Sequence, residues 1–267
     1  MNAVRHYLLA LQFFTRIPVT GGLARWVGYS PAMLRASAAH FPGVGLLVGA
    51  LAALAFGAAM ALLPVTAATP FVAAALCTVF TVLLTGAFHE DGLADVADGL
   101  GGGATPERAL EIMKDSRVGA FGVIAVALAL FTKLGLLALL GSIGGGWFAM
   151  AALLAAHVVS RFLPLWLIAL LPHVGDAAGS KSNPLAERID TASLLGALAW
   201  LLLGLALAGL ALDPQELAGG LAGALLAWLW MWRLLARRLG GFTGDGLGAA
   251  QQVCEVGFYL GLALAVA

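Results

Sequence analysis

Long apolar runs separated by short polar segments make up most of this chain from residue 43 onward. A helix needs about 20 apolar residues to cross the hydrocarbon core of a membrane. We predict an all-α, polytopic membrane bundle with six to seven transmembrane helices, the seventh being the short run 253–267. Because such helices need neighbours to pack against, residues 1–267 are expected to form a single domain. The other predicted spans are 43–63, 70–88, 119–140, 147–171, 192–212 and 217–236.

The first residues, MNAVRHYLLALQFFTRIPV, follow a different pattern. Their apolar stretch lies between His6 and Arg16 and is too short to span a membrane. We expect an amphipathic helix lying at the membrane surface, and no cleavable signal peptide.

Basic residues occur in alternate loops. The segments PVTAATP, GSIGGG and DPQE, which follow the first, third and fifth spans, contain no Lys or Arg. By the positive-inside rule the other loops, which are also the longer ones, face the cytoplasm together with the N-terminus. Any chemistry is therefore expected at the cytoplasmic face. The basic residues of these segments are Arg5, Arg16, Arg25, Arg35, Arg108, Lys114, Arg117, Lys181, Arg188, Arg233, Arg237 and Arg238.

Composition supports the membrane class, since 61% of residues are hydrophobic, 10% are charged and the mean hydropathy is +0.98. A soluble chain has roughly 25% charged residues. The 14 basic and 14 acidic residues balance, which argues against a nucleic-acid partner. Cys77 and Cys254 lie in or beside apolar runs, and we expect two buried free thiols.

One polar segment, HEDGLADVADGLGGG at residues 89–103, crowds carboxylates at the end of an apolar run. Asp91, Asp95 and Asp98 recur at i, i+4 and i+7, within about 60° of one another on a helix, whereas Glu90 points elsewhere. Three carboxylates on one face repel unless a cation neutralises them. Oxygen ligands favour Mg²⁺ or Mn²⁺, and Mg²⁺ often takes its remaining ligands from substrate phosphates. The segment therefore indicates phosphoryl or nucleotidyl chemistry; the alternative is an acidic turn that caps a membrane helix.

The residues that follow extend this interpretation. GLGGG at 99–103 predicts a flexible, exposed backbone that can approach phosphate. Thr105 is a predicted N-cap of the next helix. Beyond that helix, Asp115 is a candidate metal ligand, and Lys114 and Arg117 are candidates for holding phosphate or are topogenic charges.

Two basic residues lie well inside predicted spans, whereas Arg233 lies near the end of its span. Arg161 follows His157 by one turn on the same face, and a mid-span arginine usually faces the bundle interior. We interpret it as a functional residue, with a structural ion pair as the alternative. Lys133 is expected to snorkel or to be paired.

Three more candidates lie in polar segments. Asp245, within GGFTGDGLGAAQQVCE, is either a ligand or phosphate-site organiser, or a helix N-cap. Arg16 and Lys181 could contact phosphate, although each alone is more typical of a topogenic charge. The pairs Gly219/Gly223 and Gly257/Gly261 permit helix packing within one chain or between copies of it, which leaves a homo-oligomer open.

Together, several stretches resemble one family. FFTRIPV, FPGVGLLVG, GAFHEDGLADVADGLGGG, KDSRVGAFG, SRFLP and GGFTGDGLGAAQQ occur in the order typical of cobalamin synthases, the adenosylcobinamide-GDP ribazoletransferases. The resemblance runs from about residue 11 to residue 256. It implies an Mg²⁺-dependent phosphotransferase of the bacterial inner membrane that joins adenosylcobinamide-GDP to α-ribazole, or its 5′-phosphate, and releases GMP.

On this resemblance we base a hypothesis about the roles of individual residues. Asp91, Asp95 and Asp98 would hold one or two Mg²⁺ at the pyrophosphate, and Asp98 or Glu90 would act as the base for the attacking ribazole hydroxyl. Basic side chains would steady phosphate oxygens, namely Lys114, Arg117 and Arg161.

Two other functions are weighed against this one. A CDP-alcohol phosphotransferase shares the logic of several aspartates near helix ends, but its motif has Ala-Arg soon after the first Asp-Gly. Here Asp91-Gly92 is followed by Leu93, Ala94 and Asp95. A transporter would favour internal repeats and polar residues near mid-membrane, whereas these acids cluster at one face.

Overall fold

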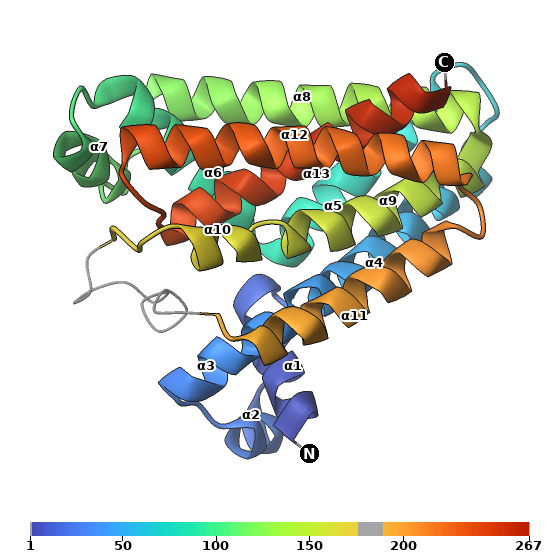
Figure 1. Cartoon of the computed structure of the whole chain (residues 1–267). Coiled ribbons are helices and arrows are strands. Elements are labelled where there is room, and N and C mark those ends of the chain that lie inside the picture. The colour runs from blue at the N-terminus through green and yellow to red at the C-terminus, as the bar shows by residue number, and fades with distance from the viewer. Residues whose placement is uncertain (1, 176–188, 267) are drawn as a thin grey trace.

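The computed structural model describes residues 2–175 and 189–266, and this part of the chain is helical with no β-strand (Figure 1). The prediction of an all-α fold is confirmed. The helices are α1 (Asn2–Phe14), α2 (Gly21–Val27), α3 (Pro31–Ser37), the 3-10 turn η1 (Ala38–His40), α4 (Phe41–Leu62), α5 (Thr69–Thr85), α6 (Phe88–Gly102), α7 (Pro106–Met113), α8 (Ala120–Ile143), α9 (Gly145–Phe162), α10 (Leu165–Leu170), α11 (Thr191–Ala208), α12 (Pro214–Arg238) and α13 (Gly244–Val266).

The number of spans agrees with the apolar pattern. Among the described residues, six helices are long and apolar enough to cross a membrane, and α5 with α6 makes a seventh if the bent pair is one span. The last span was predicted too short, because α13 begins at Gly244 rather than at residue 253. The polar residues Gln251, Gln252 and Glu255 are buried within this helix and do not interrupt it.

Small residues let the helices approach closely. α12 packs along α13, α4 packs along α9, and α6 lies against both α13 and α8. Gly219 and Gly223 face Gly261 and Gly257 across the contact of α12 with α13, so these glycine pairs pack within one chain. Both cysteines are free and buried, as predicted.

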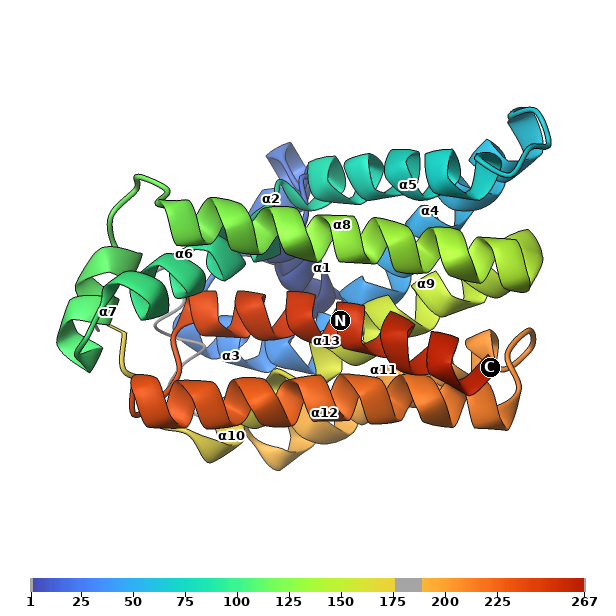
Figure 2. The same cartoon turned by 90° about the horizontal axis from the view of Figure 1, so that it is seen from above.

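The short loops that contain no Lys or Arg gather at one end of the bundle. The α4–α5, α8–α9 and α11–α12 connections lie at this end, together with the C-terminus of α13, whereas α7 lies at the opposite end (Figures 1 and 2). The predicted alternation of loops is therefore realised in the fold. The predicted N-terminal helix is α1; α2 and α3, which continue beside it, were not predicted.

A sharp bend separates α5 from α6. The two helices meet at 88°, and both connecting residues have left-handed backbone conformations, Gly86 at φ 66° and Ala87 at φ 57°. Span 70–88 was therefore predicted three residues too long, since α5 ends at Thr85. The bend starts a new helix that carries the acidic segment.

Candidate functional site

The predicted acidic face lies on α6. Asp91 is exposed and Asp95 is half-buried, and neither carboxylate makes a hydrogen bond or ion pair with another described residue. Glu90 is buried on the other side of the helix, where Gln252 Nε2 donates to its Oε1 at 3.1 Å. The predicted separation of Glu90 from the aspartates is confirmed, and α6 has one polar face toward solvent and one toward the bundle.

A glycine brings this face to the start of α13. A Cβ added at Gly92 would lie 2.8 Å from the carbonyl oxygen of Asp245, so only glycine permits this approach. Asp245 is the second residue of α13, and the helix is capped instead by Thr243, whose Oγ1 accepts from Gly246 N at 3.0 Å. The N-cap alternative for Asp245 is therefore wrong. Its charge acts on Asp95, as do the charges of the other two aspartates of the face.

Asp98 occupies a different environment from its two neighbours. Its carboxylate accepts from Gly119 N at 2.7 Å and from Gly122 N at 2.8 Å, at the N-terminus of α8. These N–H groups have no partner within α8, and the carboxylate from α6 satisfies them. The capping alternative thus describes Asp98, whereas Asp91 and Asp95 do not cap a helix.

The oxygen donors of this region match the chemistry of Mg²⁺. No group of three or more His, Cys, Asp or Glu within residues 2–175 and 189–266 is arranged to hold a metal ion by itself. Mg²⁺ commonly uses one or two carboxylates and completes its shell with water and substrate phosphates. Asp91, Asp95 and Asp245 fit that mode of binding, since they are not taken up by capping.

The α7–α8 connection places basic groups beside Asp98. A cavity of about 340 Å³ is lined by Asp98, Arg108 and Arg117, among others. Arg117 Nη2 lies 2.6 Å from Asp115 Oδ2, and its hydrogen bonds hold the pKa of Asp115 down at about 2. Arg108 pairs in the same way with Glu111 at 2.6 Å. Exposed pairs of this kind contribute little stability, so neither arginine is strongly held by its carboxylate partner.

The glycines before α7 do not form the flexible, exposed segment that the sequence predicted. Residues 99–102 belong to α6, so the predicted flexible segment is wrong. A Cβ at Gly99 would collide with Met113, and one at Gly103 would lie 2.6 Å from the Ala109 backbone. The glycines therefore let α7 pack onto α6. Thr105 caps α7 as predicted, accepting from Arg108 N at 3.3 Å.

A buried polar cluster lies deeper in the bundle. Arg161 is 4% exposed and its Nη1 lies 2.9 Å from His157 Nδ1, so their predicted proximity is confirmed. Lys133 does not snorkel; its Nζ lies 2.6 Å from Glu255 Oε1, and both side chains are buried. Glu255 was missed, although its spacing of four residues from Gln251 marked a polar face inside an apolar helix.

The three remaining basic candidates have different outcomes. Arg16 lies at the α5–α6 bend, where its backbone N–H donates to Leu84 O at 2.7 Å and its side chain lies against Gly86. It is thus close to the start of α6. Lys181 lies outside the described residues. Lys114 ends α7 as its C-cap residue.

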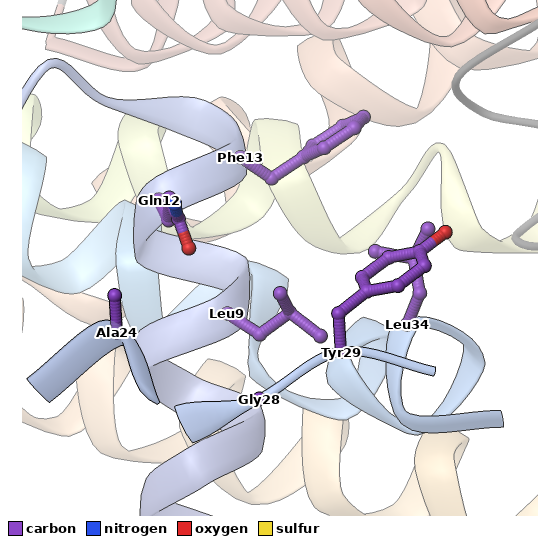
Figure 3. A pocket seen from close by; sticks show the side chains of 7 residues that line it. All are labelled: Leu9, Gln12, Phe13, Ala24, Gly28, Tyr29 and Leu34. Carbon is purple, nitrogen blue, oxygen red and sulfur yellow. The ribbon is translucent and has the colours of Figure 1, made fainter. Parts of the chain in front are cut away.

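A larger cavity of about 570 Å³ lies between α1, α2 and α3 (Figure 3). Its wall is mostly apolar and aromatic, its polar side-chain groups are the Gln12 amide and the Tyr29 hydroxyl, and none of its lining side chains is charged. One lining residue, Phe13, also packs on Phe88 of α6, with ring centroids 5.1 Å apart. The lining residues are Leu9, Gln12, Phe13, Ala24, Gly28, Tyr29 and Leu34.

Comparisons with known proteins agree on one family. The sequence pattern of the cobalamin-5-phosphate synthase family matches residues 6–263. The chain is 63% identical to the adenosylcobinamide-GDP ribazoletransferase of Polaromonas sp. strain JS666, over 98% of both chains. It is 60% identical to the protein of that name from Polaromonas naphthalenivorans, over 100% of both, and 60% identical to that from Albidiferax ferrireducens, over 98% of both. No solved structure matches.

Proposed function

The chain belongs to the cobalamin-5-phosphate synthase family, and we propose on this premise that it is an adenosylcobinamide-GDP ribazoletransferase. In the proposed reaction a hydroxyl of α-ribazole, or of its 5′-phosphate, attacks the phosphorus next to cobinamide. The P–O bond to GMP breaks, and the hydroxyl proton passes to a carboxylate of the acidic face. The products are GMP and adenosylcobalamin, or its 5′-phosphate.

The observation that carries the proposal is the meeting of α6 with α13. Two unbonded carboxylates, Asp91 and Asp95, lie beside Asp245 because Gly92 allows the helices to touch. A purely structural cluster would have its acids paired or capping, as Asp98 is. Carboxylates left free at one end of a membrane bundle support a site for a charged, phosphate-bearing substrate.

One or two of Asp91, Asp95 and Asp245 would hold Mg²⁺ together with water and substrate phosphate, and the ion would supply charge neutralisation for the pyrophosphate when bound. The chain's own residues do the remaining work. Asp98 fixes α6 against α8, so the acidic face keeps its place. Glu90 faces the bundle interior and anchors the first turn of α6 through Gln252.

Arginines beside the acidic face would bind phosphate oxygens. Arg117 and Arg108 line the cavity at Asp98, and each is held by a single exposed carboxylate that substrate can displace. A guanidinium binds phosphate in a bidentate manner. We propose these two residues for the pyrophosphate, with Arg16 at the α5–α6 bend as a further contact.

The proposed location is the bacterial inner membrane, with the acidic face toward the cytoplasm. Basic residues gather in the loops at the α7 end of the bundle, whereas the opposite loops carry no Lys or Arg. By the positive-inside rule, this distribution supports a cytoplasmic location for α7 and the acidic face.

The test is GMP release by the detergent-purified full chain, given adenosylcobinamide-GDP and α-ribazole phosphate with Mg²⁺ or with EDTA. We expect release only with Mg²⁺ and both substrates. Release of CMP from a CDP-alcohol instead would indicate a phospholipid enzyme. No release from folded protein in lipid would overturn the proposed function.

A further inference from the structure

Glu255 lies at the centre of the buried polar cluster. It is 1% exposed and sits halfway along α13. Its Oε1 is 2.6 Å from Lys133 Nζ and accepts from Tyr259 OH at 3.2 Å. Its Oε2 accepts from Gln251 Nε2 at 2.7 Å. One carboxylate therefore joins α13 to α8 in a region of the bundle where an unpaired charge is costly.

Arg161 and His157 complete the cluster on α9. An arginine can only donate, so His157 Nδ1 accepts the 2.9 Å bond from Arg161 Nη1 and the imidazole proton lies on Nε2. His157 is then neutral, and the 3.6 Å separation of its Nδ1 from Glu255 Oε2 is not an ion pair. The cations of the cluster are Lys133 and Arg161, and the carboxylates that act on Arg161 are Glu255 and Glu90.

A continuous chain of hydrogen bonds connects this cluster to α6. Gln251 Nε2 donates to Ser160 Oγ at 3.0 Å as well as to Glu255. Gln252 Nε2 donates to Gln251 Oε1 at 3.0 Å and to Glu90 Oε1 at 3.1 Å. Buried networks of this kind restrict each member to one arrangement.

This series of hydrogen bonds adds a constraint on the rotation of the first turn of α6, beside the bonds of Asp98 to α8 further along the helix. Glu90 and Asp91 are adjacent, so they point about 100° apart on the helix. While Glu90 is held inward by Gln252, Asp91 and Asp95 face outward beside Asp245. The bend at Gly86 and Ala87 separates α6 from α5, so α5 does not fix this rotation.

We propose that Glu255, acting through Gln251 and Gln252, is a positioning residue that locks the rotation of α6 and keeps the acidic face beside α13. The proposal rests on the proposed function for its effect on turnover. Its effect on α6 itself is independent of that function. A displacement of reacting groups by about 1 Å can cost up to a hundredfold in rate.

The test is Gln252→Met, which removes the link to Glu90 and leaves Lys133 and Glu255 paired. Gln215→Met, at an exposed glutamine on α12, is the matched control. We expect Gln252→Met to lower kcat about tenfold and to raise the Mg²⁺ concentration for half-maximal rate, with KM for adenosylcobinamide-GDP changed less than twofold. Backbone amide hydrogen exchange in residues 88–95 should become about tenfold faster, and the melting temperature should fall below that of the control, because buried Glu90 Oε1 and Gln251 Oε1 each lose a donor.

Two results would overturn the proposal. If Gln252→Met has the same exchange rate in α6 and the same kcat as the wild type, the link to Glu90 does not position the helix. A lower melting temperature with unchanged kcat and Mg²⁺ dependence would make the cluster a stabilising feature only. Faster exchange in α6 when even the wild type releases no GMP would uphold the positioning role and reject the proposed function instead. Glu255→Asp, which shortens the reach but keeps the charge, should give an intermediate exchange rate.

Discussion

Asp98 of α6 and Gly122 of α8 are joined by a hydrogen bond of 2.8 Å from the glycine N–H to the carboxylate. With the 2.7 Å bond from Gly119, it makes Asp98 the cap of a helix that begins 22 residues later in the chain, at Ala120. Loss of a helix cap costs about 1–2 kcal/mol. We expect Asp98→Ala to destabilise by this amount and Asp98→Asn by less, because asparagine keeps one acceptor oxygen. Thermal unfolding in detergent would measure both.

A methyl group at Gly122 should have a similar effect through sterics. An added Cβ would collide with the Asp98 carboxylate, and relieving such a clash costs about 1–3 kcal/mol. Gly135 lies on the same helix with open space around its Cβ position, so Gly135→Ala is the matched control. Equal stability of the two variants would mean that α6 and α8 can shift apart to accommodate the methyl group at little cost in free energy.

The pattern of apolar and polar residues predicted the helical bundle well, because the length of an apolar run can be read directly from the local sequence. It could not predict the 88° bend, since alanine rarely adopts the left-handed conformation that Ala87 has there. The role of Gly99 could not be predicted either, because it depends on which side of α7 packs against α6. Local sequence gives periodicity, whereas contacts between distant helices decide these details.

The candidate site was predicted in part for the same reason. The i, i+4, i+7 spacing placed Asp91 and Asp95 on one face, and the structure adds the approach of Asp245 through Gly92. Spacing alone could not separate Asp98 from them, because its partners are backbone N–H groups of another helix. Glu255 was hidden for a comparable reason, since its partner Lys133 lies on α8.

The double variant Asp91→Asn, Asp95→Asn tests the acidic face directly. We expect GMP release to fall below detection while membrane insertion and melting temperature are kept, because neither side chain bonds to another described residue. Glu107→Gln, at an exposed acid on α7, is the control. Turnover within tenfold of the wild type would remove these two residues from the proposed mechanism.

The buried pair of Lys133 and Glu255 predicts strong coupling. Removing one partner of a buried pair leaves an uncompensated charge and costs about 3–5 kcal/mol, whereas removing both can be nearly neutral. We expect Lys133→Met to unfold at much lower temperature, and Lys133→Met with Glu255→Gln to regain much of the loss. A double-mutant cycle on melting temperatures measures the coupling. Additive effects would contradict the 2.6 Å contact.

Arg117 should contribute to substrate binding more than to turnover. Its guanidinium lines the cavity beside Asp98, and a charge-assisted hydrogen bond to a phosphate oxygen contributes about tenfold in affinity. We expect Arg117→Gln to raise KM for adenosylcobinamide-GDP about tenfold and to leave kcat within threefold. Arg25→Gln, at an exposed arginine on α2, is the control. An unchanged KM would show that residues other than Arg117 bind the substrate phosphates.

The partner of Arg117 gives a prediction on pH. Hydrogen bonds from Arg117 hold the pKa of Asp115 at about 2, below its ordinary value of 3.8. A group whose pKa is lowered on folding stabilises the fold above its unfolded pKa and loses that contribution only as pH falls through its folded value. Asp115 thus stays ionised across the range of about pH 5–8 in which turnover would be assayed. We expect Asp115→Asn to change the rate of GMP release by a constant factor over this range, and a change in the shape of the pH profile would show that Asp115 titrates during turnover.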